Sequence, residues 1–225
     1  MNNKQRVARH ALQWITDNMI IGLGTGSTAD CFIEALAHKY KQENVHIHVV
    51  ASSIVSMIKA RDLGLPLVSL EQLEHIDIYV DGADEVAPDN TLLKGQGADL
   101  VREKLLATAS HQFIALVDQS KQVPSIGNKF PIPIEVMPFA WQMVKYQLEK
   151  QGAKGKLRQQ GNGLAVSSYG SLILDMKFPE QVDLQKIEHI LNTTPGIIEH
   201  GIFSPQADIV VLATENGVQE IQKPS

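Results

Sequence analysis

The segment MIIGLGTGSTA, residues 19–29, carries the clearest structural signal in this sequence. Its apolar part, 19–24, ends in glycine and predicts a strand. The residues that follow, 27–40, predict a helix, with Ser27 or Thr28 as the side chain that caps its first turn. Repetition of such a strand–turn–helix unit is typical of α/β proteins with a parallel sheet.

The same alternation continues on both sides of this segment. Sequence patterns predict further strands at 45–52, 76–80 and 113–117, and further helices at 4–18, 53–64 and 98–110. Because these strands are apolar at consecutive positions, both faces of their sheet should be covered by helices. We therefore expect a Rossmann-like α/β domain built on a parallel sheet.

The pattern changes after Pro131. The segments up to residue 203 are predicted as β-α-β-β-α-β, which is the order of the ferredoxin-like motif. We expect a smaller α+β domain at 131–203, and a catalytic α/β domain formed by 1–130 plus 204–225. The tail contains one more apolar strand, which should return to the first sheet.

Composition restricts the kinds of partner. The 225 residues carry a net charge of −5 and no long basic run, which argues against a nucleic-acid or membrane-surface binder. No apolar run approaches the length of a membrane span, and the first residues lack the apolar core of a signal peptide. A single cysteine excludes an intrachain disulfide, and His46 and His48 lack the partners of a zinc site. We expect a cytoplasmic protein.

The junction GLGTGSTA, residues 22–29, is a candidate anion site. Ligands of open parallel sheets bind beyond the carboxyl ends of the strands, and glycines there let backbone N–H groups approach an anion. A tight turn alone would explain the glycines, but the hydroxyls of Thr25, Ser27 and Thr28 favour an anion site. The spacing does not fit a P-loop, because no Gly-Lys-Ser or Gly-Lys-Thr follows. It does not quite fit the dinucleotide fingerprint either, and no acid follows the second strand, so a nicotinamide cofactor is disfavoured.

The segment DGADEV, residues 81–86, places three carboxylates after an apolar strand. A hydrophilic turn with Asp84 as a helix cap is the simplest interpretation. A magnesium site and a site for sugar hydroxyls are the alternatives, although the spacing does not fit a calcium loop. Because Asp81, Asp84 and Glu85 follow a buried strand so closely, we favour a binding site over a simple turn.

KGQGADLVREK, residues 94–104, combines two glycines with charged residues. Gly95 and Gly97 can expose N–H groups that, together with Lys94, would stabilise a developing oxyanion. Glu103 lies further along the predicted helix, where an isolated acid is commonly solvated or complements the helix dipole. Lys121 could be a surface lysine, but its position directly after the strand 113–117 favours a role in the site.

Taken together, GLGTGSTA, YVDGADEV, KGQGADLVREK and DQSK resemble, in order and spacing, ribose-5-phosphate isomerase of type A. The similarity covers essentially the whole chain. It implies interconversion of D-ribose 5-phosphate and D-ribulose 5-phosphate through a cis-enediolate, in the non-oxidative pentose phosphate pathway and without a metal. It also implies an α/β domain with a small α+β domain, assembled as a homodimer or homotetramer.

The resemblance assigns roles to matching positions. Glu103 would be the general base, and Asp81 and Asp84 the acids that handle hydroxyls and assist ring opening. Lys94 and the amides that follow it would stabilise the enediolate. The residues implied to bind substrate are Lys4, Thr25, Gly26, Ser27, Thr28, Asp81, Gly82, Ala83, Asp84, Lys94, Gly95, Gln96, Gly97 and Lys121.

Two positions depart from the family pattern. Gln96 stands where the family commonly has glycine, so its φ angle must suit a non-glycine residue if its N–H is to serve as a donor. Asp99 stands where a small residue is usual, four residues before Glu103. We hypothesise that its charge raises the pKa of Glu103.

Other functions occur on related folds. A sugar-phosphate sensor domain of a transcription regulator would need a helix-turn-helix, for which the residues before Gly22 leave no room. A sugar-phosphate deaminase or a coenzyme A transferase would use a catalytic set different from KGQGADLVREK. A sensor that binds a sugar phosphate without catalysis is the alternative to the isomerase.

Overall fold

The computed structural model describes residues 1–43, 45–204 and 207–224. Within them, a six-stranded sheet has the order β15-β14-β6-β3-β1-β2. Its strands are β1 (Met19–Leu23), β2 (Ile47–Ala51), β3 (Ile76–Gly82), β6 (Ser110–Asp118), β14 (Ile209–Thr214) and β15 (Gly217–Gln222). All neighbours are parallel except β14 and β15. Numbered along the chain, the parallel strands follow the doubly wound order 2-1-3-4-5.

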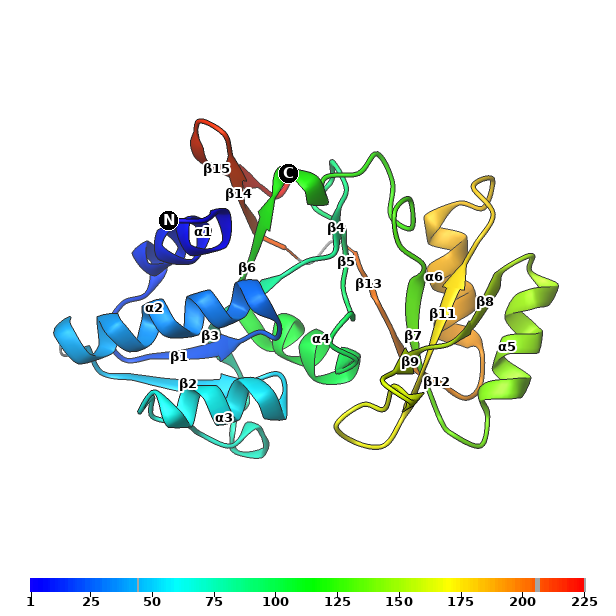
Figure 1. Cartoon of the computed structure of the whole chain (residues 1–225), viewed down its shortest axis with the longest axis horizontal. Coiled ribbons are helices and arrows are strands. Elements are labelled where there is room, and N and C mark those ends of the chain that lie inside the picture. The colour runs from blue at the N-terminus through cyan, green and yellow to red at the C-terminus, as the bar shows by residue number, and fades with distance from the viewer. Residues whose placement is uncertain (44, 205–206, 225) are drawn as a thin grey trace.

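Helices cover both faces of this sheet (Figure 1). One face packs against α1 (Asn3–Ala11), α2 (Ser27–Glu43) and α3 (Ile54–Asp62), and the other against α4 (Leu100–Ala109). Consecutive strand residues such as Val49 and Val50 enter opposite cores. This two-sided burial explains the unbroken apolar runs and confirms the predicted α/β class.

A second sheet has the order β12-β7-β11-β8 and is antiparallel throughout. Its elements follow one another as predicted, β-α-β-β-α-β, in the ferredoxin-like arrangement. They are β7 (Ile132–Val136), α5 (Trp141–Lys150), β8 (Lys154–Leu157), β11 (Leu172–Lys177), α6 (Leu184–Thr193) and β12 (Ile197–His200). A short hairpin, β9 (Gln159–Gln160) and β10 (Gly163–Leu164), extends from it.

A small sheet of β4 (Glu85–Val86), β5 (Leu92–Leu93) and β13 (Ile202–Phe203) joins the two larger ones. Leu92 packs into the core of the parallel sheet, whereas its neighbour Leu93 packs into the core of the antiparallel sheet. Figure 1 shows these strands and α4 in the middle of the molecule. The segment that starts at Lys94 therefore emerges where both large sheets meet.

Three local predictions differ from the structure. The helix expected at 4–18 ends at Ala11 and is followed by a single 3-10 turn, after which the chain becomes extended at Ile15 (φ −90°, ψ 114°). The N-cap of α2 is Gly26, whose carbonyl accepts the N–H of Asp30, and not Ser27 or Thr28. The tail returns to the sheet as predicted but forms a hairpin instead of one strand.

Within the described ranges, none of the helices combines the length and the apolar character needed to cross a bilayer.

Candidate active site

A cavity of about 200 Å³ opens at the carboxyl ends of β1 and β3. At this point the strand order reverses, since α2 leaves on one face of the sheet and α4 on the other. Such a reversal creates a crevice in which doubly wound sheets bind ligands. The volume is below the roughly 300–1,000 Å³ of sites for drug-sized ligands, and it suits one small metabolite.

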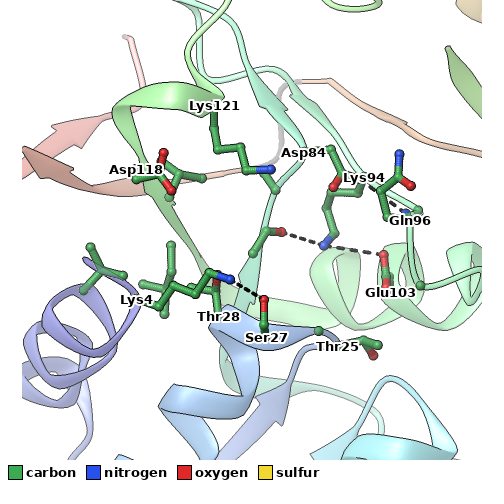
Figure 2. A pocket seen from close by; sticks show the side chains of 18 of the residues that line it. Lys4, Thr25, Ser27, Thr28, Asp84, Lys94, Gln96, Glu103, Asp118 and Lys121 are labelled. Atoms are coloured by element: carbon green, nitrogen blue, oxygen red, sulfur yellow. Dashed lines mark hydrogen bonds and ion pairs between the residues drawn. The ribbon is translucent and has the colours of Figure 1, made fainter. Parts of the chain in front are cut away.

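One end of the cavity is lined with groups that favour an anion. The Nζ of Lys4 donates to the Oγ of Ser27 at 2.6 Å, and Lys121 reaches the same cavity from the 3-10 turn η3 (Gln119–Lys121). The first N–H groups of α2 have no partner inside their own helix and carry the positive end of its dipole. Figure 2 shows both lysines directed into the cavity, on the side away from Glu103.

The opposite end is built around Glu103, which α4 presents to the cavity. Its side chain is 3% exposed, and its Oε2 lies 3.4 Å from the Nζ of Lys94. This is an ion-pair distance without hydrogen-bond geometry, and within the described residues Oε2 has no hydrogen-bond partner. A buried carboxylate oxygen without a donor is rare, and it is suited to accept a proton.

The surroundings shift the pKa values of both groups. Burial raises the pKa of Glu103 to about 8; the ammonium of Lys94 lowers it in part, and the carboxylates of Asp81 and Asp84 raise it further. Burial alone would lower the pKa of Lys94, but the charges of Asp81 and Glu103 outweigh burial and raise it. The site therefore contains a carboxylate of raised basicity beside a permanently charged ammonium.

Asp81 does not line the cavity, in contrast to the predicted contact with substrate. Its side chain is fully buried, and each oxygen accepts two hydrogen bonds. The N–H groups of Thr25 and Gly82 donate to Oδ1, while the hydroxyl of Tyr79 and the Nζ of Lys94 donate to Oδ2. Asp81 thus fixes the glycine turn and Lys94 from behind the cavity wall.

Asp84 lines the cavity, and burial raises its pKa. Its Oδ2 accepts the N–H of Gln96 at 3.3 Å. The replacement of glycine by Gln96 is compatible with this contact, because the described non-glycine residues with positive φ are Asn18, Asn90 and Ala98. The unusual conformation lies two residues further on, at Ala98 (φ 66°).

The hypothesis that Asp99 raises the pKa of Glu103 stays a prediction, and Asp99 is not among the groups with the largest effect on that pKa. Asp99 accepts the N–H of Ser168 at 2.8 Å, and its charge raises the pKa of Glu135 instead. Asp81 and Asp84 are the acids that act on Glu103. Spacing of four residues placed Asp99 near Glu103 in the sequence, but the chain turns at Ala98, and the side chain of Asp99 faces the smaller sheet.

All predicted site residues other than Asp81 line the cavity. Sequence reasoning missed Asn3, Val7, Leu116, Val117 and Asp118. Val7 lies one turn after Lys4 on α1, and a helical projection through Lys4 would have identified it. Asn3 is one turn before Val7 but adjacent to Lys4 in the sequence, so the same projection would not have pointed to it. Leu116 and Val117 look like ordinary strand residues, so no signal in the sequence distinguishes them.

Comparison with known proteins gives a consistent result. The family model described as ribose 5-phosphate isomerase A (phosphoriboisomerase A) matches residues 48–217. The ribose-5-phosphate isomerase A of Thermococcus kodakarensis is 42% identical over 98% of this chain and 97% of its own.

Solved structures agree over the full length. A D-ribose-5-phosphate isomerase in complex with phospho-erythronic acid is 42% identical, with a TM-score of 0.94 over 99% of this chain and 100% of that chain. Ribose 5-phosphate isomerase A from Methanocaldococcus jannaschii is 35% identical, with a TM-score of 0.93 over 98% of each chain. By sequence and by structure, the chain belongs to the ribose 5-phosphate isomerase A family.

Proposed function

We propose that this protein interconverts D-ribose 5-phosphate and D-ribulose 5-phosphate through a cis-enediolate, as a step of the non-oxidative pentose phosphate pathway. The observation that carries this proposal is the buried Oε2 of Glu103, which accepts no hydrogen bond from the described residues and lies 3.4 Å from the Nζ of Lys94, in a cavity with two further lysines. A full-length match to enzymes named for this reaction supports it.

The reaction needs a base and a stabilised oxyanion. In the open-chain aldose, Glu103 removes the proton from C2, and the electrons move to the carbonyl oxygen at C1. Returning the proton to C1 and moving a proton between the two oxygens completes the ketose. A positioned base contributes about 10²–10⁴-fold to the rate. Lys94 and the N–H groups of Gln96 and Gly97 stabilise the negative oxygen.

Binding of the phosphate orients the sugar. Lys4, Lys121 and the first turn of α2 form the anion-binding end, so the phosphate lies there and C1 and C2 extend toward Glu103. The solved relative in complex with phospho-erythronic acid holds a phosphorylated polyhydroxy acid, whose carboxylate resembles the negative charge of an enediolate.

The two aspartates have different roles in this proposal. Asp84 handles sugar hydroxyls and assists ring opening, since it faces the cavity and its raised pKa favours proton exchange. Asp81 acts from behind, by holding Lys94 at 2.7 Å. Gly82 and Ala83, which lie between the two aspartates in the sequence, line the wall of the cavity.

Further parts of the proposal concern the cellular setting. We propose a cytoplasmic enzyme that works without a metal ion, because Lys94 supplies the positive charge that a metal would otherwise provide. We also propose a homodimer or homotetramer, which size-exclusion chromatography with light scattering tests directly.

Turnover of ribose 5-phosphate in the presence of a chelator tests the reaction. We expect isomerisation at an unchanged rate with excess EDTA. Binding of ribose 5-phosphate without turnover would contradict the proposal and support a sensor. A rate that falls with EDTA and returns with a divalent ion would contradict only the metal-free mechanism.

A further inference from the structure

Arg158, between β8 and β9, reaches from the smaller sheet to the loop 94–97. Its Nε and Nη2 donate to the two carboxylate oxygens of Asp175 on β11, at 2.9 and 2.6 Å. Its remaining nitrogen, Nη1, donates to the carbonyl oxygen of Gly95 at 2.6 Å and to that of Gln96 at 3.2 Å. The side chain of Arg158 is 13% exposed, so this fork is largely shielded from water.

These contacts determine where the neighbouring N–H groups point. In a trans peptide the C=O and the following N–H point in opposite directions. Because the carbonyl of Gly95 points toward Arg158, the N–H of Gln96 points away from it, and it donates to Asp84 at the cavity. The carbonyl of Gln96 also points toward Arg158, so the N–H of Gly97 points away from Arg158, and Gly97 lines the cavity.

The loop needs external support. Ala98 has a left-handed conformation (φ 66°), which is unfavourable for a residue with a side chain. The N–H of Lys94 donates to the carbonyl of Gly201 at 2.8 Å, so the loop is also tied to the smaller sheet at its start. Arg158 supplies the corresponding contact in the middle of the loop.

We propose that Arg158 is a positioning residue for the isomerase reaction. Held by Asp175, its guanidinium fixes two successive peptide planes and directs the N–H groups of Gln96 and Gly97 toward the cavity. There they donate to the oxygen that becomes negative, and the N–H of Gln96 gives up its 3.3 Å contact with Asp84 to do so. Its positive charge behind the two carbonyls also stabilises this arrangement of peptide dipoles. The inference rests on the proposed function, since it assigns these N–H groups to the enediolate.

Steady-state kinetics of Arg158→Ala, Arg158→Lys and Asp175→Asn test the inference. The enediolate needs the aligned N–H groups more than the ground-state substrate does. We therefore expect kcat of Arg158→Ala to fall by about 10- to 100-fold, with KM within about 3-fold of the wild type. Lysine retains the charge but not the forked guanidinium, so kcat of Arg158→Lys should lie between those of Arg158→Ala and the wild type.

The matched controls are Arg61→Ala and Asp62→Asn, because Arg61 and Asp62 form an exposed Arg–Asp pair at 2.8 Å that is remote from the cavity. Both controls should retain wild-type kinetics. Far-UV circular dichroism establishes that each variant is folded. If Arg158→Ala does not fold, Arg158→Lys and Asp175→Asn still carry the test.

Chemical rescue separates positioning from general loosening. Free guanidinium, at concentrations far below those that unfold the protein, should raise kcat of Arg158→Ala because Asp175 can still bind it. It should not rescue the double variant Arg158→Ala/Asp175→Asn, which lacks that carboxylate. Rescue confined to the single variant supports the inference.

Three results would overturn it: kcat of Arg158→Ala within twofold of the wild type, a loss confined to KM, or no rescue by guanidinium. In each case a wild type that turns over ribose 5-phosphate leaves the proposed function intact. A wild type without turnover would refute the proposed function, and this inference with it.

Discussion

Glu103 occupies an environment that disfavours its charged form. It is buried, and the negative charges of two further carboxylates, Asp81 and Asp84, raise its pKa in addition to burial. Lys94 compensates only partly, at 3.4 Å. Sites of this kind are costly for stability and are common where a base must work near neutral pH.

Glu103→Gln should therefore abolish turnover while substrate still binds. We expect kcat to fall by about 10²–10⁴-fold, because glutamine has a similar shape but cannot accept the proton. Calorimetric titration with ribose 5-phosphate measures binding, and Glu74→Gln, at an exposed position, serves as the matched control. Turnover near the wild-type rate would refute the role of Glu103 as base.

The pH dependence of kcat/KM follows from the same side chain. Glu103 must be ionised to act as a base, so activity is present above its pKa and is lost as pH falls below about 8. An ordinary glutamate, with a pKa of about 4.3, would leave the rate unchanged to far lower pH. The pH–rate profile of the wild type measures this limb.

Variants of the neighbouring acids identify which charge matters. Asp84→Asn removes a charge that raises the pKa of Glu103, so the acid limb of the pH–rate profile should move to lower pH. Asp99→Asn should leave it in place, because Asp99 binds Ser168. A shift with Asp99→Asn and none with Asp84→Asn would reverse this assignment.

Most residues that line the cavity could be predicted from the sequence, because they follow an apolar strand or belong to the segment around Gly95 and Gly97. The sequence could not identify the burial of Asp81, since a polar residue at a strand end is equally compatible with exposure. Arg158 was beyond reach for a different reason: its contact with Gly95 spans 63 residues and depends on how two sheets meet.

At the scale of elements, the turn between β1 and α2 depends on close backbone approach. A Cβ at Gly24 would lie 2.0 Å from the Cγ of Asp81, whose four hydrogen bonds prevent it from moving. Gly26, by contrast, has free space but a φ of 98°. The two glycines are thus required for different physical reasons, which spacing in the sequence does not distinguish.

Gly24→Ala should destabilise the fold through this collision. We expect the free energy of unfolding to fall by at least about 1–3 kcal/mol, as for other overpacked sites. Urea unfolding measures it, with Gly163→Ala in β10 as the control, because no atom lies within 4 Å of a Cβ there. Equal stabilities of the two variants would show that Asp81 can move aside.

Element types were predictable from the sequence where hydrophobic periodicity was strong, as in the five parallel strands. The ends of the helices and strands were less predictable. The first helical region ends early because the chain becomes extended at Ile15. The two-residue turn of the β14–β15 hairpin consists of Glu215 and Asn216, and Gly217 already belongs to β15. The two-residue strands β4, β5 and β13 are too short to produce a periodic pattern.

At the scale of the whole molecule, we propose that 1–130 plus 204–225 and 131–203 form two domains that unfold as one unit. The contacts Arg158–Gly95 and Gly201–Lys94 link them, and Leu93 of β5 packs in the core of the smaller sheet. Because these links lie close to the loop 94–97, unfolding of either domain should also disorder the active site.

The two tryptophans provide one reporter for each domain. Trp14 packs against the core under α1 and α2, and Trp141 against the core of the smaller sheet. We expect Trp14→Phe and Trp141→Phe to show the same urea midpoint by fluorescence as by circular dichroism, which is the test of a single transition. Separate midpoints for the two fluorophores would contradict coupled unfolding.

The N-terminal helix is completed by the far end of the chain. Arg6 of α1 donates to the carbonyl oxygen of Thr214 in β14, and the loop 94–97 is held by Arg158 and Gly201. During translation, the ribosome therefore releases Glu103 and Lys94 long before the segments that support them. A nascent polypeptide that already contains every proposed catalytic group remains inert until almost the whole message has been read.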